Sequence, residues 1–181
     1  MICGIDPSLT NTAVVCGESI TDYTVDRFGS KFVSDSVVDR CKRYEGLVHR
    51  VNACVAAAAP TAIFIEAYAF SRNDAKAKFV AEYGGLLRWH LADITPHIYE
   101  VSPMTLKKFV TGKGNVKKNV VMAHIQKRYG VLFENDDEAD AFGLYQLGLV
   151  AIGITAGNSA QREAAEKILG KVRAAGQPAK V

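Results

Sequence analysis

The stretch ICGIDPSLTNTAVVC, residues 2–16, decides the fold. Its two apolar runs, Ile2–Ile5 and Thr12–Cys16, are separated by a polar turn that contains Pro7. Short apolar runs bounded by Pro, Ser and Asn are typical of neighbouring β-strands. Asp6 ends the first run, and a charge at the end of an apolar strand costs solvation free energy unless it has a partner. The stretch therefore predicts the start of an antiparallel meander, with a candidate functional carboxylate at the end of its first strand.

The patterns that follow this stretch alternate between strand and helix. They predict further strands over residues 20–25, 27–33, 62–66 and 97–101. They predict helices over 36–59, 74–92 and 102–110, from an Asn115 cap to 130, over 141–156 (buried) and over 161–174. Helical crossovers between later strands favour parallel pairing. We therefore expect an α/β fold with a mixed five-stranded sheet, an antiparallel meander plus parallel strands, flanked by helices.

The size and composition indicate an ordinary globular protein. The chain has 181 residues, of which 49% are hydrophobic, and a net charge of +3. This length suits one domain, expected over residues 1–175, followed by a flexible tail over 176–181. The net charge is too small to indicate a nucleic-acid partner, so only the distribution of charge can do so. We expect no secretory signal and no membrane span.

The four cysteines are scattered along the chain and form no C-x-x-C pair. They are Cys3, Cys16, Cys41 and Cys54. Cysteines in apolar or helical surroundings without paired spacing favour reduced, buried thiols over a disulfide framework or a zinc site. This usage predicts a cytoplasmic protein.

Three more carboxylates lie where a metal-dependent site would need them. Glu66 ends the apolar run of residues 62–66, while Asp137 and Asp140 are three residues apart at the start of a helix and share one face of it. Neighbouring strands lie about 4.8 Å apart, so Asp6 and Glu66 can share an ion. Mg²⁺ prefers such oxygen ligands, and two-metal phosphodiester hydrolysis places its ions about 3.5–4 Å apart between carboxylates. The simpler alternatives are a turn residue at Asp6 and an acidic first helical turn at Asp137 and Asp140.

The chain resembles the RuvC family of Holliday-junction resolvases. The resemblance lies in GIDPS (residues 4–8), IE (65–66), VTGKGNVKK (110–118) and DEADAF (137–142). It implies a ribonuclease-H-like fold and a structure-selective DNA endonuclease that resolves four-way junctions by paired symmetric nicks. It also implies a homodimer and two Mg²⁺ ions per active site, with Mn²⁺ as a substitute, and it makes Asp6, Glu66, Asp137 and Asp140 the metal ligands.

Basic and aromatic side chains surround these carboxylates in the sequence. The resemblance points to Lys107 and Lys118 as catalytic or phosphate-binding residues, while Lys108, Lys113 and Lys117 are predicted contacts to the DNA backbone. The loop after Glu66 adds three candidate DNA-binding residues, Tyr68, Phe70 and Arg72. The family's phenylalanine matches Ala69 here, so the aromatic residue that acts at the crossover stays open. A surface charge run and ordinary core packing are the simpler alternatives. We interpret Asp136 and Glu138 as solvated charges.

Other functions fit parts of the pattern. A related nuclease that cuts other branched DNA or RNA would need the same carboxylates. Actin-like and sugar-kinase-like nucleotide-binding proteins also end their first strand in Gly-x-Asp, but 181 residues are too few for their two lobes. A non-catalytic DNA-binding scaffold is disfavoured because all four carboxylates are present.

Overall fold

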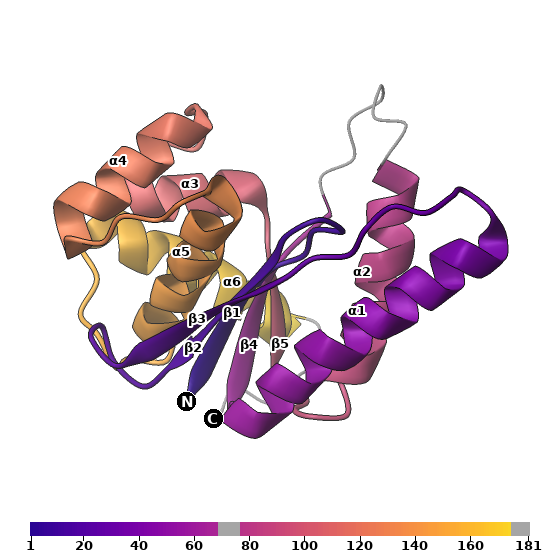
Figure 1. The fold of residues 1–181 in the computed structure, drawn as a ribbon. Helices are drawn as coiled ribbons and strands as arrows, with labels where there is room; N and C mark the ends of the chain where they lie inside the picture. Colours follow the sequence, from indigo (N-terminus) through magenta and orange to yellow (C-terminus); the bar gives the residue numbers. More distant parts are fainter. Residues whose placement is uncertain (69–76, 175–181) are drawn as a thin grey trace.

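The computed structural model describes residues 1–68 and 77–174 and is built around one mixed sheet (Figure 1). The strand order is β3-β2-β1-β4-β5, in which β1 pairs antiparallel with β2, β2 antiparallel with β3, and β1, β4 and β5 run parallel. The strands are β1 (Ile2–Asp6), β2 (Thr12–Gly17), β3 (Tyr23–Phe28), β4 (Ala62–Glu66) and β5 (Ile98–Val101). The predicted mixed five-stranded sheet is confirmed.

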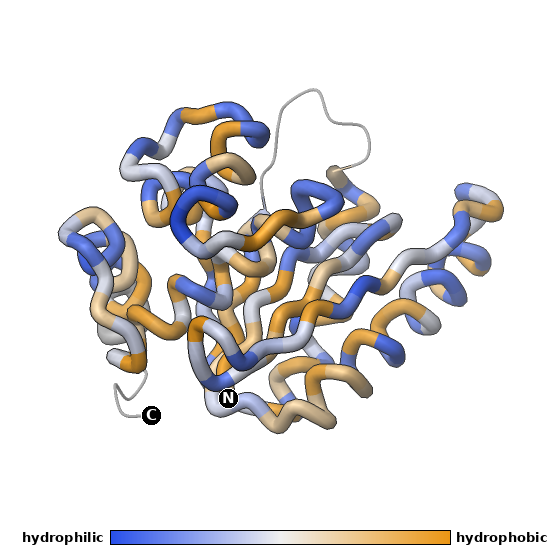
Figure 2. Tube along the Cα trace, turned by 60° about the vertical axis from the view of Figure 1, so that its left-hand side comes forward, coloured by the Kyte–Doolittle hydropathy of each residue, from blue (hydrophilic) through white to orange (hydrophobic). Residues whose placement is uncertain are grey.

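Helices cover both faces of this sheet. On one face lie α1 (Val37–Ala58) and α2 (Ala77–Leu91), and on the other lie α3 (Pro103–Thr111), α4 (Lys118–Tyr129), α5 (Asp136–Ala151) and α6 (Ser159–Ala174). Each face of the sheet has its own buried hydrophobic cluster. Hydrophobic residues follow the strands, while hydrophilic residues mark many of the outer turns and loops (Figure 2). No helix within the described ranges has both the length and the apolarity that a membrane crossing requires.

The closest packing in the fold joins β1 to α5. A Cβ atom at Gly4 would overlap the carbonyl oxygen of Ala141 and the backbone nitrogen of Tyr145. Only glycine allows two backbones to approach this closely. The contact places the N-terminal turns of α5 beside the end of β1, where Asp6 lies.

Several expected element boundaries differ from the structure. The buried helix expected over 141–156 both begins and ends earlier, as α5 (Asp136–Ala151). The predicted strands over 20–25 and 27–33 are a single strand, β3, because its pairing with β2 ends at Phe28 and the backbone of Ser30 bonds instead to the carbonyl of Leu9. Asn115 does not cap α4. The helix begins only after Val116, which packs against the core, so the capping position is Lys117. Lysine gives no capping hydrogen bond because its ammonium has no acceptor. The predicted tail over 176–181 lies outside the described residues.

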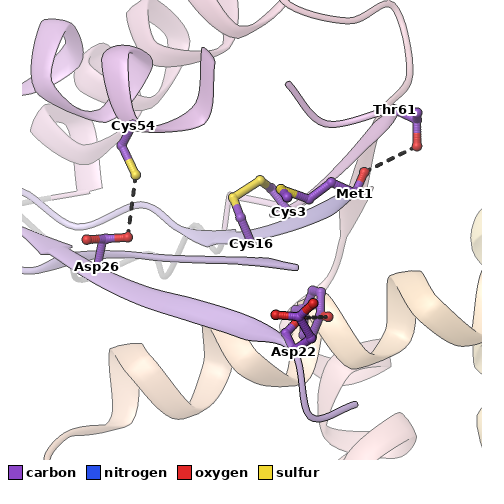
Figure 3. Close-up of a disulfide and its surroundings, with 8 residues drawn as sticks. Met1, Cys3, Cys16, Asp22, Asp26, Cys54 and Thr61 are labelled. Carbon is purple, nitrogen blue, oxygen red and sulfur yellow. Dashed lines mark hydrogen bonds between the residues drawn. A yellow bond between two sulfur atoms is a disulfide. The ribbon is translucent and has the colours of Figure 1, made fainter. Parts of the chain in front are cut away.

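The expectation that all four thiols are reduced and buried is wrong. Cys3 and Cys16 form a disulfide between β1 and β2 (Figure 3). The antiparallel register places them opposite one another, with 4.2 Å between their Cα atoms. Of the other two cysteines, Cys41 is exposed and Cys54 is half-buried, its thiol donating to Asp26 at 3.6 Å. The prediction of a cytoplasmic location therefore loses the support of reduced thiols and stays a prediction.

Candidate active site

The four predicted carboxylates come from three elements that meet at one edge of the sheet. Ile5 of β1 pairs with Ile65 of β4, so the next residue on each strand, Asp6 and Glu66, lie side by side. Asp137 and Asp140 lie in the first turns of α5, which the contact at Gly4 holds against β1. The structure thus brings together residues that are more than 130 positions apart in the chain.

Burial and mutual repulsion decide the protonation of this cluster. Asp6 is only 6% exposed, and burial, followed by the charge of Glu66, raises its pKa well above the usual range. A hydrogen bond between the Asp6 and Glu66 side chains adds to the rise in the pKa of Asp6. Burial also raises the pKa of Glu66, and this hydrogen bond partly offsets the effect. Both carboxyls therefore ionise less readily than free ones, as crowded, desolvated acids do.

The acids on α5 belong to the same electrostatic unit. Burial and then the charge of Glu66 raise the pKa of Asp140 to about 7. Asp137 is held by Asn11 of the β1–β2 loop, whose amide nitrogen donates to its carboxylate at 2.8 Å. The same Asn11 nitrogen donates at 3.1 Å to Asn135, the capping residue of α5. Asn11 thereby ties the loop after β1 to the start of α5, a positioning role that the sequence analysis missed.

Two of the predicted lysines reach this cluster. The charges of Lys118 and Lys107 both lower the pKa of Glu66. Lys118 forms an ion pair with Asp136, and this contact raises the pKa of its ammonium, with smaller effects from Asp140 and Asp6. Its side chain is still 64% exposed, so it can meet a ligand from solvent.

The other predicted DNA-binding residues lie further out. Lys108 pairs with Glu163 of α6, while Lys113 and Lys117 are exposed. The ring of Tyr68 lies 4.2 Å from the guanidinium of Arg88, and its hydroxyl donates to the carbonyl of Ala81 at 3.4 Å, so it packs on α2. Phe70 and Arg72 fall outside the described residues. Contacts of all these side chains with DNA stay predictions.

Asp136 and Glu138 are not the solvated charges that we expected. Asp136 pairs with Lys118, while Glu138 is 6% exposed and lies 3.1 Å from the guanidinium of Arg27. The carboxylate of Glu138 also accepts the backbone N–H of Glu134 at 3.0 Å. Neither partner is adjacent in sequence, so only the folded arrangement of β3, α4 and α5 reveals these roles.

Arg88 is a second positioning residue that sequence reasoning missed. Its guanidinium donates to the carbonyl of Glu66 at 2.7 Å, to the carboxylate of Glu100 at 2.7 Å and to the carbonyl of Gly84 at 3.0 Å. It therefore fixes the end of β4 to β5 and α2. A lone arginine in a predicted helix carries no sequence signal for this role.

The donor set at this edge of the sheet fits a hard divalent cation. Four carboxylates supply only oxygen ligands, and a bound cation would relieve the mutual repulsion that helps to raise the pKa values of Asp6 and Asp140. Within the described ranges, no three acidic, histidine or cysteine side chains stand close enough to hold an ion as they are oriented. Binding of an ion by three of them would therefore require rotation of these side chains.

The chain is similar to known proteins over most of its length. The family model described as "Crossover junction endodeoxyribonuclease RuvC" matches residues 2–145. The RuvC of Carboxydothermus hydrogenoformans is 29% identical over 157 residues, which cover 84% of this chain and 97% of the relative. The RuvC of Caldicellulosiruptor saccharolyticus is 24% identical over 147 residues, covering 79% and 88%.

Solved structures share the fold. Thermus thermophilus RuvC superimposes with a TM-score of 0.62 at 22% identity, covering 86% of this chain and 98% of that one. The same protein in complex with a Holliday junction substrate gives 0.61 at 19% identity, covering 80% and 89%. The predicted ribonuclease-H-like fold is confirmed. Because the family model covers most of the chain, including all four carboxylates, the protein belongs to the RuvC family of crossover junction endodeoxyribonucleases.

Proposed function

We propose that this chain resolves four-way DNA junctions by paired, symmetric, metal-dependent nicks, with Asp6, Glu66, Asp137 and Asp140 as the metal ligands. The observation that carries the proposal is the cluster of these carboxylates, of which Asp6 is buried and the others half-buried, with two lysines at its rim, in a chain of this family. A buried group of acids lowers its free energy when a cation binds it, and the same cation is what phosphodiester hydrolysis needs.

The side chains around the proposed metal site would have different roles in the reaction. When bound, two Mg²⁺ ions, or Mn²⁺ in their place, supply an activated water and stabilise the leaving oxygen. Lys107 and Lys118 lie on the rim of the cluster, where their charges can offset the charge that develops on the scissile phosphate. Asp136 orients Lys118, and Arg88 holds the backbone of Glu66.

We propose further that the active form is a homodimer, because two symmetric nicks require two sites on one junction. The face of α2 that carries Leu86 and Trp89 supports this. Trp89 is 75% exposed and Leu86, three residues earlier on the same helical face, is 37% exposed. Large exposed apolar side chains that share a face are typical of an interface between protein chains.

A nicking assay with Mg²⁺ on four-way, three-way and linear DNA, run beside single-stranded RNA, tests the function. We expect rapid cleavage of the four-way junction alone, at symmetric positions, and ligatable products. Light scattering of the same sample should give the mass of a dimer. Equal rates on linear and four-way DNA would contradict structure selectivity, and cleavage of RNA alone would favour the related-nuclease alternative.

Lys118→Ala is expected to impair the chemical step, and Lys113→Ala is expected to impair DNA binding. Loss of Lys118 should slow the chemical step roughly 10²-fold, because its charge lies beside Glu66 and Asp140, whereas junction affinity should change little. Loss of exposed Lys113 should weaken binding and lower the slope of log Kd against log salt by about one. Single-turnover rates and salt titrations separate the two effects, and identical behaviour of the two variants would contradict the assignment.

A further inference from the structure

A basic groove runs along the N-terminal half of α1, on the opposite face of the sheet from α3 and α4 (Figure 1). Two adjoining cavities, of about 610 Å³ and about 330 Å³, form it, and Arg43 lines both. The larger cavity is also lined by Ser8, Leu9 and Thr10, in the loop that follows Asp6. This surface, here named the α1 groove, therefore reaches the loop that directly follows Asp6.

The α1 groove concentrates positive charge. Its acidic lining residues are Asp35 and Asp39, and its basic ones are Lys31, Arg40, Lys42, Arg43 and Arg50. The lining therefore carries a net charge of +3, the same as that of the entire chain. Local concentration of this kind, in a chain of small net charge, is the electrostatic footprint of a nucleic-acid site.

Most of this charge is not neutralised within the protein. Arg43 donates to the Ser30 hydroxyl at 2.8 Å and to the Leu9 carbonyl at 3.3 Å. Arg50 donates to the Gly29 carbonyl at 2.7 Å. Neutral acceptors hold a guanidinium in place without cancelling its charge.

The other basic residues of the groove are Lys31, Lys42 and Arg40. Neither Lys31 nor Lys42 forms an ion pair with any carboxylate of the described ranges. Of the basic residues that line the groove, only Arg40 forms an ion pair within the described ranges, with Glu82 at 3.3 Å. The groove therefore offers an anion two guanidinium groups held by neutral acceptors, Arg43 and Arg50, and two lysines without an ion pair within the described ranges.

We propose that the α1 groove binds the phosphates of a duplex arm that leaves the active site on the α1 side. The inference rests on the proposed function. The loop residues Ser8, Leu9 and Thr10, which line the groove, closely follow Asp6 in the chain, and a junction held at its branch point sends arms in more than one direction. From Arg40 to Arg50 the helix is about 15 Å long, which matches about four base pairs at 3.4 Å per step.

Binding measurements on junctions of different arm length test this proposal. Lys42→Glu is compared with Lys167→Glu, a matched charge reversal at an exposed position on α6. Without divalent ions, Lys42→Glu should weaken binding of a junction with 20-base-pair arms roughly tenfold and reduce the salt slope by one to two. With arms trimmed to about two base pairs and closed by short loops, wild type and Lys42→Glu should bind equally, because the trimmed arm no longer fills the groove.

The outcomes separate the groove from the active site. Single-turnover cleavage at saturating protein and Mg²⁺ should stay within about twofold of wild type in Lys42→Glu, since the groove only holds the arm. Equal losses in Lys42→Glu and Lys167→Glu, or a loss independent of arm length, would overturn the proposal. The exposed side chains of Phe32 and Val33 beside the groove would then point to a protein partner instead. Failure of the wild type to cut any junction would instead contradict the proposed function.

Discussion

Asp6→Asn is expected to lower the rate of junction cleavage roughly 10³-fold or more, while junction binding without divalent ions stays near the wild-type level. The substitution removes the charge of a proposed metal ligand at the end of β1 and leaves every basic side chain in place. Glu66→Gln and Asp140→Asn should behave alike, and Asp137→Asn should be as severe or slightly milder. Single-turnover rates at saturating Mg²⁺ measure the effect, and a rate within tenfold of wild type for any of the first three would contradict the site.

Thermal unfolding shows whether the loss of activity reflects chemistry or misfolding. The pKa of Asp6 is raised in the folded protein, so its ionisation costs folding free energy as the pH rises from the unfolded-state pKa through the folded-state pKa. A neutral asparagine removes this cost. Without divalent ions at pH 8, Asp6→Asn should therefore melt no lower than wild type, and added Mg²⁺ should stabilise the wild type more than the variant.

Gly4→Ala is expected to destabilise the protein by about 3 kcal/mol or more, the upper end of overpacking effects. The added methyl group would overlap backbone atoms of Ala141 and Tyr145, which cannot rotate away as a side chain can. Separation of α5 from β1 would also move Asp140 away from Asp6, so cleavage should fall even in the fraction that stays folded. Denaturant unfolding and single-turnover cleavage measure the two effects.

Gly46→Ala is the matched control. Gly46 lies within α1, and a Cβ atom there meets nothing within 4 Å. The same substitution should therefore stabilise the protein by about 0.5–1 kcal/mol through helix propensity. A similar loss of stability in both variants would show that the contact between β1 and α5 is looser than the structure indicates.

The sequence predicted those features that depend on local pattern. Short apolar runs located the strands, and Asp6 and Glu66 were found at the ends of two of these runs. The capping signal Ser102-Pro103 correctly marked the start of α3. Helical spacing placed Asp137 and Asp140 on one face. Each of these signals lies within a few residues of the position that it describes. They can therefore be read from the sequence without knowledge of the fold.

Features that depend on register or on distant partners could not be predicted in this way. The pairing of Cys3 with Cys16 follows from the alignment of β1 and β2, which no spacing rule for cysteines contains. The contacts of Asn11 with Asp137 and of Arg88 with the backbone of Glu66 join separate elements. Their detection required the sheet order and the packing of α2 and α5 on it.

The backbone contact at Gly4 also limits how the site can adapt to different ions. Main-chain atoms have no rotamers, so the separation between the end of β1 and the first turns of α5 does not relax when neighbouring side chains change. The freedom to fit a smaller or larger cation lies in the torsion angles of the four acids. Discrimination between Mg²⁺ and a wider ion such as Ca²⁺ would then be a question of side-chain reach across a rigid gap, not of opening or closing the protein.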